Sequence, residues 1–384
     1  MAVSPNVFLE RFQFQKPQIN LARPTAVRMW LVNLCAFLVI VQSSFSDSFS
    51  SLFIAGGAVI AALLTEFLIL FPSGRARFLK DGSAVATALI LTLFLPNRIS
   101  PLYAMAGAVI AIAVIKHSFG GLGSNWLNPA AGGWLFIRLS WPAAFSRALE
   151  ASPLSLLSES LSRGVTNPQG SPLGILKIDA GFFSLPAQLD GILRSFLNNT
   201  IFSFTGSELP EGYIDLFVSR LPGIIADRGV FALIIGTIII TASQVNRSWI
   251  PAVYLTVFGV LARFAGALPF GGVEWNGDVL FALCSGGTLA AAFFFAADPA
   301  TGPKSNGGIF LAAAAAGGIA FFFRFFGMEP YGVVFAALLV NALVPLVRIF
   351  ESRRLYEKRS RRPNPGAKVS LYGILPDMNP RSRV

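Results

Sequence analysis

Long apolar runs are the feature that most restricts the fold of this chain. A membrane-spanning helix needs about 20 mostly apolar residues, and such windows recur throughout the sequence. With 54% hydrophobic and 13% charged residues, the composition is not that of a soluble globule of 384 residues. We therefore expect an all-α polytopic membrane protein, with spans at 29–46, 51–72, 101–117, 229–245, 249–269, 278–297, 308–326 and 331–350.

Two further apolar segments, 83–96 and 129–142, are too short to cross a bilayer as regular helices. Asp81 and Ser83 are candidate caps for the first, and Asn128-Pro129 opens the second with proline in the first turn. Short or broken helices at membrane depth are tolerated where protein buries them or where they line a cavity. Counting both segments gives about ten transmembrane helices.

The basic residues predict the orientation of these helices. Of the 30 Lys and Arg residues, 10 lie from Arg348 onward, directly after an apolar run, and others gather before residue 29, around residues 75–80, and at Lys116, Arg247 and Lys304. The positive-inside rule makes these faces cytoplasmic, so the net charge of +11 indicates membrane orientation rather than nucleic-acid binding. The expected parts are a cytoplasmic segment 1–28, a membrane half 29–142, an extracytoplasmic loop region 143–220, a membrane half 221–350 and a basic cytoplasmic tail 351–384.

Five helices on each side of the loop region would be inverted halves, because a shift by five spans reverses orientation. The stretch "DGSAVATALILTLF" (81–94) would then correspond to "GDVLFALCSGGTLAAAFFF" (277–295). Each begins with an Asp beside a Gly. This arrangement would bring both segments to a site near the midplane, as in many secondary transporters, and an unrelated transporter is therefore one alternative function.

Few residues of the chain are suited to hold metals. Cys35 and Cys284 each lie in an expected span, no CxxC motif is present, and His117 is the only histidine. We expect no zinc site, iron–sulfur cluster or bis-histidine haem within this chain. The sequence itself indicates no catalytic residue.

Several polar residues in the apolar runs have two interpretations each. Glu66 lies within a span, where an acid is costly and is usually paired or functional, and its alternative is a snorkelling or neutralised side chain near the cytoplasmic interface. For Asp81, Asp278 and Asp298 capping is the simpler role. The arginines near the outer ends of spans, Arg138, Arg263 and Arg324, could bind an anion or snorkel.

Small residues and one short motif have two further interpretations. The stretches "AAAAAGGIA" (312–320) and "GGTLAAAFFFAAD" (286–298) favour close helix packing over a cofactor pocket. The triplet in "NPAAGG" (128–133) resembles half of an aquaporin signature, but the second copy is only "DPAT" (298–301), which does not begin a half-helix. A water channel is therefore disfavoured.

Three long blocks together resemble one family, which contains the RnfD protein of the Rnf complex and its sister, the NqrB protein of the sodium-translocating NADH:quinone reductase. They are "DGSAVATALILTLFLPNRISPLYAMAGAVIAIAVIKHSFGGLGSNWLNPAAGGWLFIRLSWP" (81–142), "FFFAADPATGPKSNGG" (293–308) and "FFRFFGMEPYGVVFAALLVNALVPLV" (322–347). Within them "FGGLGxNxxNPA" and "DPxTxP" are specific. Length and the "SPN" start are more similar to RnfD.

The resemblance implies about ten helices in two inverted halves, in a bacterial inner membrane. It further implies an FMN joined by a phosphoester bond to a threonine of an outer loop, and often a second, noncovalent flavin such as riboflavin. Asn128 is a candidate to bind flavin. Such a protein relays electrons while its complex moves Na+ or H+. Its partners would be the other Rnf or Nqr proteins and a flavin-attaching enzyme.

The loop "RGVTNPQGSPLGIL" (163–176) stands where the family carries approximately Asp-Gly-x-Thr-x-Ala-Thr-Pro-Leu. Ser171 falls on the flavin-bearing threonine, and Thr166 is a weaker alternative. The loop departs from the family pattern, since Arg163 replaces the acid, Gly170 the alanine, and two extra residues separate the halves. The departures favour an alternative in which the protein has lost covalent FMN and serves as a scaffold or ion path.

A second departure lies at "GIIADRGVFALIIG" (223–236), where the family has Gly-Glu-Thr-Ser before a helix. Asp227 matches the glutamate by position and, with Glu66, is a candidate for the ion path. Arg228 is a candidate to pair with Asp227 or with a flavin phosphate.

Overall fold

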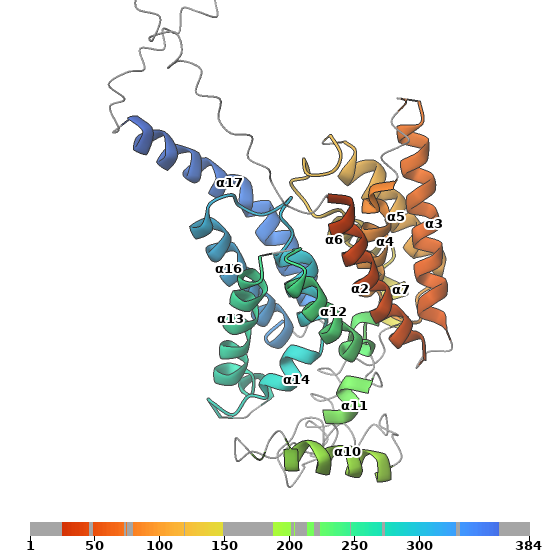
Figure 1. Ribbon diagram of the computed structural model, residues 1–384, viewed down its shortest axis with the longest axis vertical. Coiled ribbons are helices and arrows are strands. Elements are labelled where there is room, and N and C mark those ends of the chain that lie inside the picture. The colour runs from red at the N-terminus through yellow and green to blue at the C-terminus, as the bar shows by residue number, and fades with distance from the viewer. Residues whose placement is uncertain are drawn as a thin grey trace, which may run out of the picture.

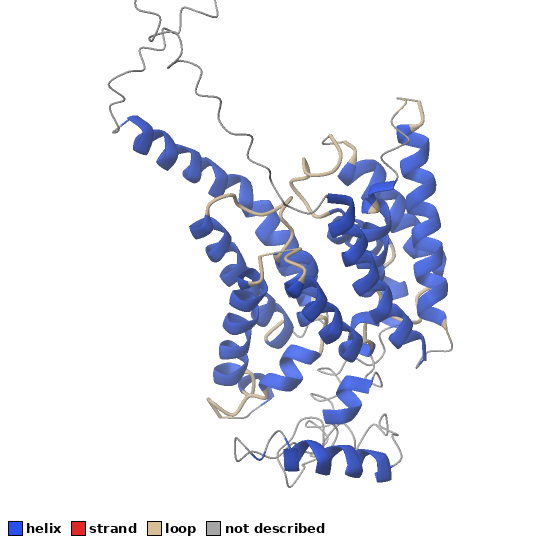
Figure 2. Ribbon diagram, viewed as in Figure 1, coloured by secondary structure: helices blue, strands red, loops and turns tan. Residues whose placement is uncertain are grey.

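The computed structural model describes residues 25–45, 49–72, 74, 80–118, 120–148, 187–200, 203, 213–218, 223–245, 247–270, 273–327 and 331–360. Within these ranges every regular element is a helix (Figure 2), and the one extended pairing is an isolated antiparallel bridge between Pro96 and Ile224. The predicted helical fold class is confirmed.

Five helices of the described chain are long and apolar enough to span a bilayer. They match the predictions at 29–46, 51–72, 249–269, 308–326 and 331–350. These helices are α2 (Thr25–Phe45), α3 (Ser50–Leu70), α13 (Trp249–Ala265, continued by the short 3-10 helix η5, Leu268–Phe270), α16 (Asn306–Phe325) and α17 (Gly332–Ser360).

The other three predicted spans are shorter or interrupted, so they are not long regular helices. The run at 101–117 is α5 (Pro101–Ile110) followed by the π-helix η2 (Ala111–Lys116), and the run at 229–245 is α12 (Val230–Ala242). The run at 278–297 divides into α14 (Val279–Cys284), α15 (Thr288–Ala291) and the π-helix η6 (Ala292–Ala296). The break falls where Gly286 and Gly287 take left-handed φ angles of 59° and 67°, which a helix does not accommodate.

Helices of the N-terminal part pack together on one side of the molecule, and those of the C-terminal part on the other (Figure 1). On the first side, α3 lies against α5 and the short α4 (Ser83–Leu93), and α5 lies against α6 (Pro129–Ser140), which leads into α7 (Pro142–Ala148). On the second side, α16 packs between α13 and α17. The predicted short helices at 83–96 and 129–142 are therefore confirmed.

Helices α2 and α12 join the two sides. A Cβ on Gly236 of α12 would lie 3.0 Å from Cβ of Cys35 on α2, and the Cys35 thiol donates to the Gly236 carbonyl at 3.4 Å. Gln42 of α2 accepts from the Ala232 amide at 2.6 Å. Cys35 is thus a small packing residue that allows the backbones to approach, as expected for small residues between membrane helices.

Glycines make similar close crossings inside each half. A Cβ on Gly133 would lie 2.6 Å from the Gly107 carbonyl oxygen, where α5 meets α6. In the second half, a Cβ on Gly317 would lie 2.5 Å from the Tyr254 carbonyl oxygen, where α13 meets α16. The packing role predicted for 312–320 is confirmed at Gly317.

The opposite ends of the molecule carry different elements. At one end α10 (Ala187–Thr200) lies across the bundle, next to α11 (Tyr213–Val218), and both come from the predicted 143–220 loop region (Figure 1). The C-terminal end of α17 projects from the bundle at the other end. Its 29 residues correspond to about 43 Å, which exceeds the hydrocarbon thickness of about 30 Å.

Candidate functional site

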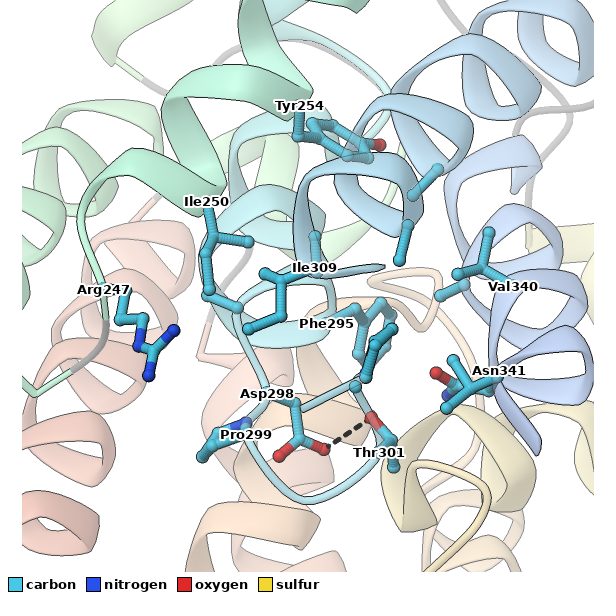
Figure 3. Close-up of a pocket in the computed structure, with 18 of the residues that line it drawn as sticks. Arg247, Ile250, Tyr254, Phe295, Asp298, Pro299, Thr301, Ile309, Val340 and Asn341 are labelled. Atoms are coloured by element: carbon cyan, nitrogen blue, oxygen red, sulfur yellow. Dashed lines mark hydrogen bonds between the residues drawn. The ribbon is translucent and has the colours of Figure 1, made fainter. Parts of the chain in front are cut away.

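Two neighbouring cavities lie on either side of the loop that begins at Asp298. The first, of about 310 Å³, is bounded by α13, η6, α16 and α17 (Figure 3). The second, of about 390 Å³, is bounded by α2, α4, the 122–130 segment and η6. Five residues line both cavities: Arg28, Val245, Asp298, Pro299 and Lys304. The loop is therefore a shared wall.

The first cavity is mainly apolar, with polar groups at its two ends. Asp298 and Thr301 lie at one end and the Tyr254 ring at the other (Figure 3). The Tyr254 hydroxyl is buried and makes no hydrogen bond within the described chain. Ala291, Ala312 and Ala316 are among the wall residues, so small residues in both predicted stretches line a cavity as well as pack helices.

Asp298 is the centre of a small polar network. Its Oδ2 accepts from Asn128 Nδ2 at 3.0 Å and from the Thr301 hydroxyl at 3.2 Å, and its Oδ1 accepts from the Ala300 amide at 3.0 Å. Desolvation in the cavity wall raises the pKa of the Asp298 carboxyl, and these hydrogen bonds oppose the rise. Asp298 stabilises the loop that it begins. The predicted capping role is wrong, since the next helix, α16, begins only at Asn306.

Asn128 uses both ends of its amide. Its Oδ1 accepts from the Ala130 and Ala131 amides at 3.0 and 3.3 Å, which caps α6 as the Asn128-Pro129 signal predicts. Its Nδ2 reaches Asp298 on the other side of the molecule. The residue that starts the short helix therefore also fixes the loop between the cavities.

Glu66 is buried and paired. The Lys116 ammonium donates to Glu66 Oε1, and His117 Nε2 lies 3.4 Å from the same oxygen. The side chains of Glu66 and Lys116 are each 3% exposed. The paired interpretation of Glu66 is confirmed and the snorkelling one is wrong. The prediction that Lys116 is a charge on the cytoplasmic face is also wrong, because its side chain is buried.

Lys116 also changes the expected role of Ser83. The ammonium donates to the Ser83 hydroxyl at 2.6 Å, and the N-cap of α4 is Gly82, without a side-chain cap. Asp81 does serve the helix start, because its Oδ1 accepts from the Ser83 amide at 2.8 Å. Ser83 thus contacts the buried ion pair and lines the second cavity.

Two charged side chains from distant segments, Arg324 and Asp227, cap the break between α14 and α15. The Arg324 guanidinium donates to the Ala282 carbonyl at 2.7 Å, to Ser285 Oγ at 3.0 Å and to Thr288 Oγ1 at 2.5 Å. Asp227 Oδ1 accepts from the Gly287 amide at 2.7 Å. A cation at a helix C-terminus and an anion at a helix N-terminus both complement the helix dipole, which stabilises the interrupted segment.

Two helix-end predictions have different outcomes at this break. Arg324 is 1% exposed, so the snorkelling expected for it is wrong. Asp278 is the N-cap of α14, since its Oδ1 accepts from the Phe281 amide at 2.9 Å, and its predicted capping role is confirmed.

The sequence matches the NQR2, RnfD, RnfE family over residues 13–357. The chain belongs to this family. A relative in Clostridium ljungdahlii is the D-type component of a proton-translocating ferredoxin:NAD(+) oxidoreductase complex, and it is 31% identical over 87% of this chain and 92% of its own length. A second relative, in Acetobacterium woodii, is the D-type component of a Na(+)-translocating ferredoxin:NAD(+) oxidoreductase complex and is 28% identical over 88% and 93%.

A third relative has a more general name. The D-type component of an ion-translocating oxidoreductase complex in Alcanivorax borkumensis is 32% identical over 79% of this chain and 84% of its own length. The resemblance to the NQR2, RnfD, RnfE family is thus confirmed across nearly the whole sequence, including the middle third that resembles it least.

The predicted site residues of this family member fall into three places. Asn128 lines the second cavity, and Glu66 lies beside the same cavity, through its contact with Lys116. Asp227 lies at the helix break, and Arg228, which follows it in the 3-10 helix η4 (Ile225–Arg228), lines neither cavity. Ser171 and Thr166 lie outside the described residues.

Sequence reasoning missed Tyr254, Thr301 and Lys116 as site residues. Tyr254 lies in a span like any aromatic core residue, and Thr301 is one of many loop hydroxyls. The signal in the sequence was the pairing of an acid and a base inside apolar runs, Glu66 in 51–72 and Lys116 in 101–117, which is expected where membrane charges are partnered.

Proposed function

We propose that this chain is the D-type membrane component of an Rnf-type ion-translocating oxidoreductase, which carries flavin and relays electrons coupled to transport of Na+ or H+. The observation that carries the proposal is the family match over residues 13–357, together with relatives named as D-type components of such complexes. The chain is one subunit of a redox enzyme and works with the other proteins of the complex. The two relatives name different ions, so either ion fits.

The cavities beside Asp298 suit a noncovalent flavin such as riboflavin. Their volumes of about 310 and 390 Å³ fall in the lower part of the range of about 300–1,000 Å³ for small-molecule sites, which are mostly apolar with a few placed polar groups. The first cavity has an alanine-rich wall with Phe295, and it is also lined by Tyr254, whose buried hydroxyl makes no hydrogen bond within the described chain. A flat aromatic ring with polar edge atoms fits these features.

The residues would act on such a ligand in distinct ways. Tyr254 would donate to an acceptor on the ring edge, while Thr301 and Asn128 would keep Asp298 oriented at the opposite end. When bound, a flavin accepts and releases electrons singly, which a relay requires. The wall alanines of α16 exclude water by close contact, and no side chain that lines the first cavity is needed as an acid or base.

Filling the cavity tests this ligand. Ala316 of α16 lines the first cavity, whereas Ala314 on the same helix does not. We expect Ala316→Leu to lower the noncovalent flavin extracted per chain, and Ala314→Leu to leave it unchanged. Overpacking costs about 1–3 kcal/mol, so folding of both variants is checked by thermal unfolding. Equal flavin content in wild type and Ala316→Leu would refute the cavity as the site.

The covalent FMN is proposed at Ser171, with Thr166 as the alternative. The motivation is the position of "SPL" in the loop and the equal hydroxyl chemistry of serine and threonine. The chain, expressed with its own flavin-attaching enzyme, is run on a denaturing gel and viewed under ultraviolet light. A fluorescent band lost in Ser171→Ala but kept in Thr166→Ala supports Ser171, and a dark wild-type band favours the scaffold or ion-path alternative.

The proposed topology is ten spans in two inverted halves of an inner-membrane protein, with both termini cytoplasmic and 143–220 outside. One contact supports the halves: Phe94 and Phe295, the last residues of the two corresponding stretches, stack with ring centroids 4.4 Å apart. An impermeant maleimide tests the orientation. We expect it to label Ser195→Cys in intact cells, and Lys80→Cys only after the membrane is opened; the reverse pattern would contradict the topology.

Glu66 and Asp227 are proposed for the ion path. Both are buried acids in an apolar chain, with exposed fractions of 2% and 3%, and buried charges in membrane proteins often mark ion routes. Ion pumping by the assembled complex should fall in Glu66→Gln and in Asp227→Asn. Pumping unchanged in either variant would remove that residue from the path.

A further inference from the structure

Four polar side chains form a continuous chain in the first half. His117 Nε2 lies 3.4 Å from Glu66 Oε1, the Lys116 ammonium donates to the same oxygen, and it also donates to Ser83 Oγ at 2.6 Å. Glu66 belongs to α3, Ser83 to α4, and Lys116 ends η2. We call these four residues the polar chain.

The polar chain connects the surface with a cavity. The His117 side chain is 14% exposed, whereas those of Glu66 and Lys116 are 3% exposed. At the other end, Lys116 and Ser83 line the 390 Å³ cavity that also contains Asp298. A group bound in this cavity would therefore contact solvent through a row of titratable and hydroxyl groups.

The π-helix η2 brings two of these residues to one carboxylate. Consecutive residues of a regular α-helix point in directions that differ by about 100°, yet Lys116 and His117 both reach Glu66 Oε1. Isolated π-helical turns occur often at functional sites. The irregular turn thus brings an ammonium and an imidazole to one carboxylate oxygen.

The Glu66 carboxylate has one oxygen that does not contact Lys116. Its second oxygen, Oε2, is buried and has no hydrogen-bond donor in the described chain, although a buried carboxylate normally has both oxygens satisfied. A proton can bind at Oε2 without displacing any contact. A Na+ ion at this carboxylate would compete with the ammonium already at Oε1, so the arrangement favours a proton over Na+ at this residue.

We propose that His117, Glu66, Lys116 and Ser83 conduct protons between the surface at His117 and the cavity beside Asp298. The Lys116 ammonium gives a proton to Ser83 Oγ while the Ser83 hydroxyl proton passes to an acceptor in the cavity. Glu66, protonated through His117, returns a proton to the Lys116 amine, and His117 takes one from water. One proton enters, one leaves, and all four groups regain their starting state without electron transfer.

The cavity acceptor rests on the proposed function, because a cofactor reduced there by an electron from a partner redox protein needs a proton to balance the added charge. The conduction itself depends only on these residues. The ion that passes Glu66 is therefore a proton, which moves from the surface to the cavity. Lys116, His117 and Ser83 are its other carriers.

The first experiment follows Glu66 in the purified, folded chain by infrared difference spectroscopy after a rapid drop in pH. We expect a carboxylic acid C=O band that is absent in Glu66→Gln. The band should appear about a hundredfold more slowly in His117→Gln, in line with the contribution of a positioned acid–base group. Lys80→Met, which alters an exposed lysine before α4, should match wild type. Absence of the band, or an equal rate in His117→Gln, would overturn the relay.

The second experiment measures proton uptake by the assembled complex in vesicles with a pH-sensitive dye while electron transfer is recorded separately. Removing one partner of a buried pair leaves the other charge unpaired and strongly destabilises a protein, so the variant tested is the charge-neutral double change Glu66→Gln with Lys116→Met. We expect slower proton uptake per electron transferred. Normal uptake in the double variant would contradict the relay, whereas wild-type chain without flavin would contradict the proposed function and leave the infrared result standing.

Discussion

Asn128 and Asp298 are joined by a 3.0 Å hydrogen bond from amide Nδ2 to carboxylate Oδ2, across 170 positions of sequence. Asn128 starts the short helix α6 in the first half, and Asp298 closes the loop after the π-helix η6 in the second. This bond lies between the two cavities. It therefore fixes the distance between the halves at the site proposed for flavin.

Exchanging these two residues tests their relationship. In Asp298→Asn alone, the new amide nitrogen faces either Asn128 Nδ2 or the Ala300 amide, and both of these are donors. One hydrogen bond is therefore lost, and an unsatisfied buried group costs about 1–3 kcal/mol of stability. Adding Asn128→Asp restores an acceptor at position 128 and a donor at position 298, and a carboxylate also caps a helix N-terminus. We expect the double variant to recover most of the thermal stability and flavin content. Additive losses in the double variant would show that the two side chains are not coupled.

Gly286 is expected to be intolerant of any side chain. Its φ of 59° costs a non-glycine residue about 1–2 kcal/mol, and a Cβ there would lie 2.4 Å from Arg324 Nε. Gly286→Ala should lower the unfolding temperature and disturb the break between α14 and α15. Gly318→Ala is the matched control, since its nearest neighbour would be Leu261 Cδ1 at 3.9 Å; alanine in a helix stabilises by about 0.5–1 kcal/mol. Similar stability of both variants would contradict this account.

Arg324 should not be replaceable by lysine. A single ammonium cannot donate to Ala282, Ser285 and Thr288 in the fork geometry of a guanidinium. Each lost hydrogen bond to a charged group is worth about 1.5–3 kcal/mol. The free energy of unfolding of the detergent-solubilised protein should therefore be clearly lower in Arg324→Lys. Arg353→Lys, at an exposed arginine on α17, should change stability by less than about 0.5 kcal/mol. A tolerated Arg324→Lys would mean that the break is stabilised elsewhere.

Two residues in the C-terminal half of α17 hold the loop that separates the cavities. Arg348 donates to the Ala300 and Gly302 carbonyls at 3.1 and 2.7 Å, and Glu351 accepts from the Lys304 and Ser305 amides at 3.1 and 3.0 Å. We expect Glu351→Ala to accelerate hydrogen exchange at those two amides, as measured by mass spectrometry. Arg354→Ala, at an exposed position on the same helix, is the control, and unchanged exchange in Glu351→Ala would refute the contact.

Helix positions in this protein were predictable where a local signal exists. Apolar runs located the five long helices, and Asn128-Pro129 and Asp278 marked two helix starts that the structure has. The interruption at Gly286-Gly287 was missed because a search for long apolar windows counts glycine as part of the run. The left-handed backbone of those two residues depends on Arg324 and Asp227, which come from distant segments.

The candidate site was predictable only in part, because its contacts join distant segments. Asn128 and Glu66 were recognised as special, but their partners Asp298 and Lys116 were interpreted as a helix cap and a surface charge. A lysine at the end of an apolar run is usually interfacial. Lys116 is buried because η2 turns it toward a carboxylate 50 positions earlier in the chain.

Burial of the Glu66–Lys116 pair has a practical consequence for experiments with salt. Mobile ions screen charges in water over about 10 Å at 0.1 M and reach buried pairs much less, and these two side chains are only 3% exposed. Raising the ionic strength should therefore leave the pair intact. It should weaken the electrostatic interactions of exposed cations of the same protein, such as Arg247 and Lys304. Replacing NaCl by an equal concentration of a salt without sodium thus separates a specific requirement for Na+ from general screening.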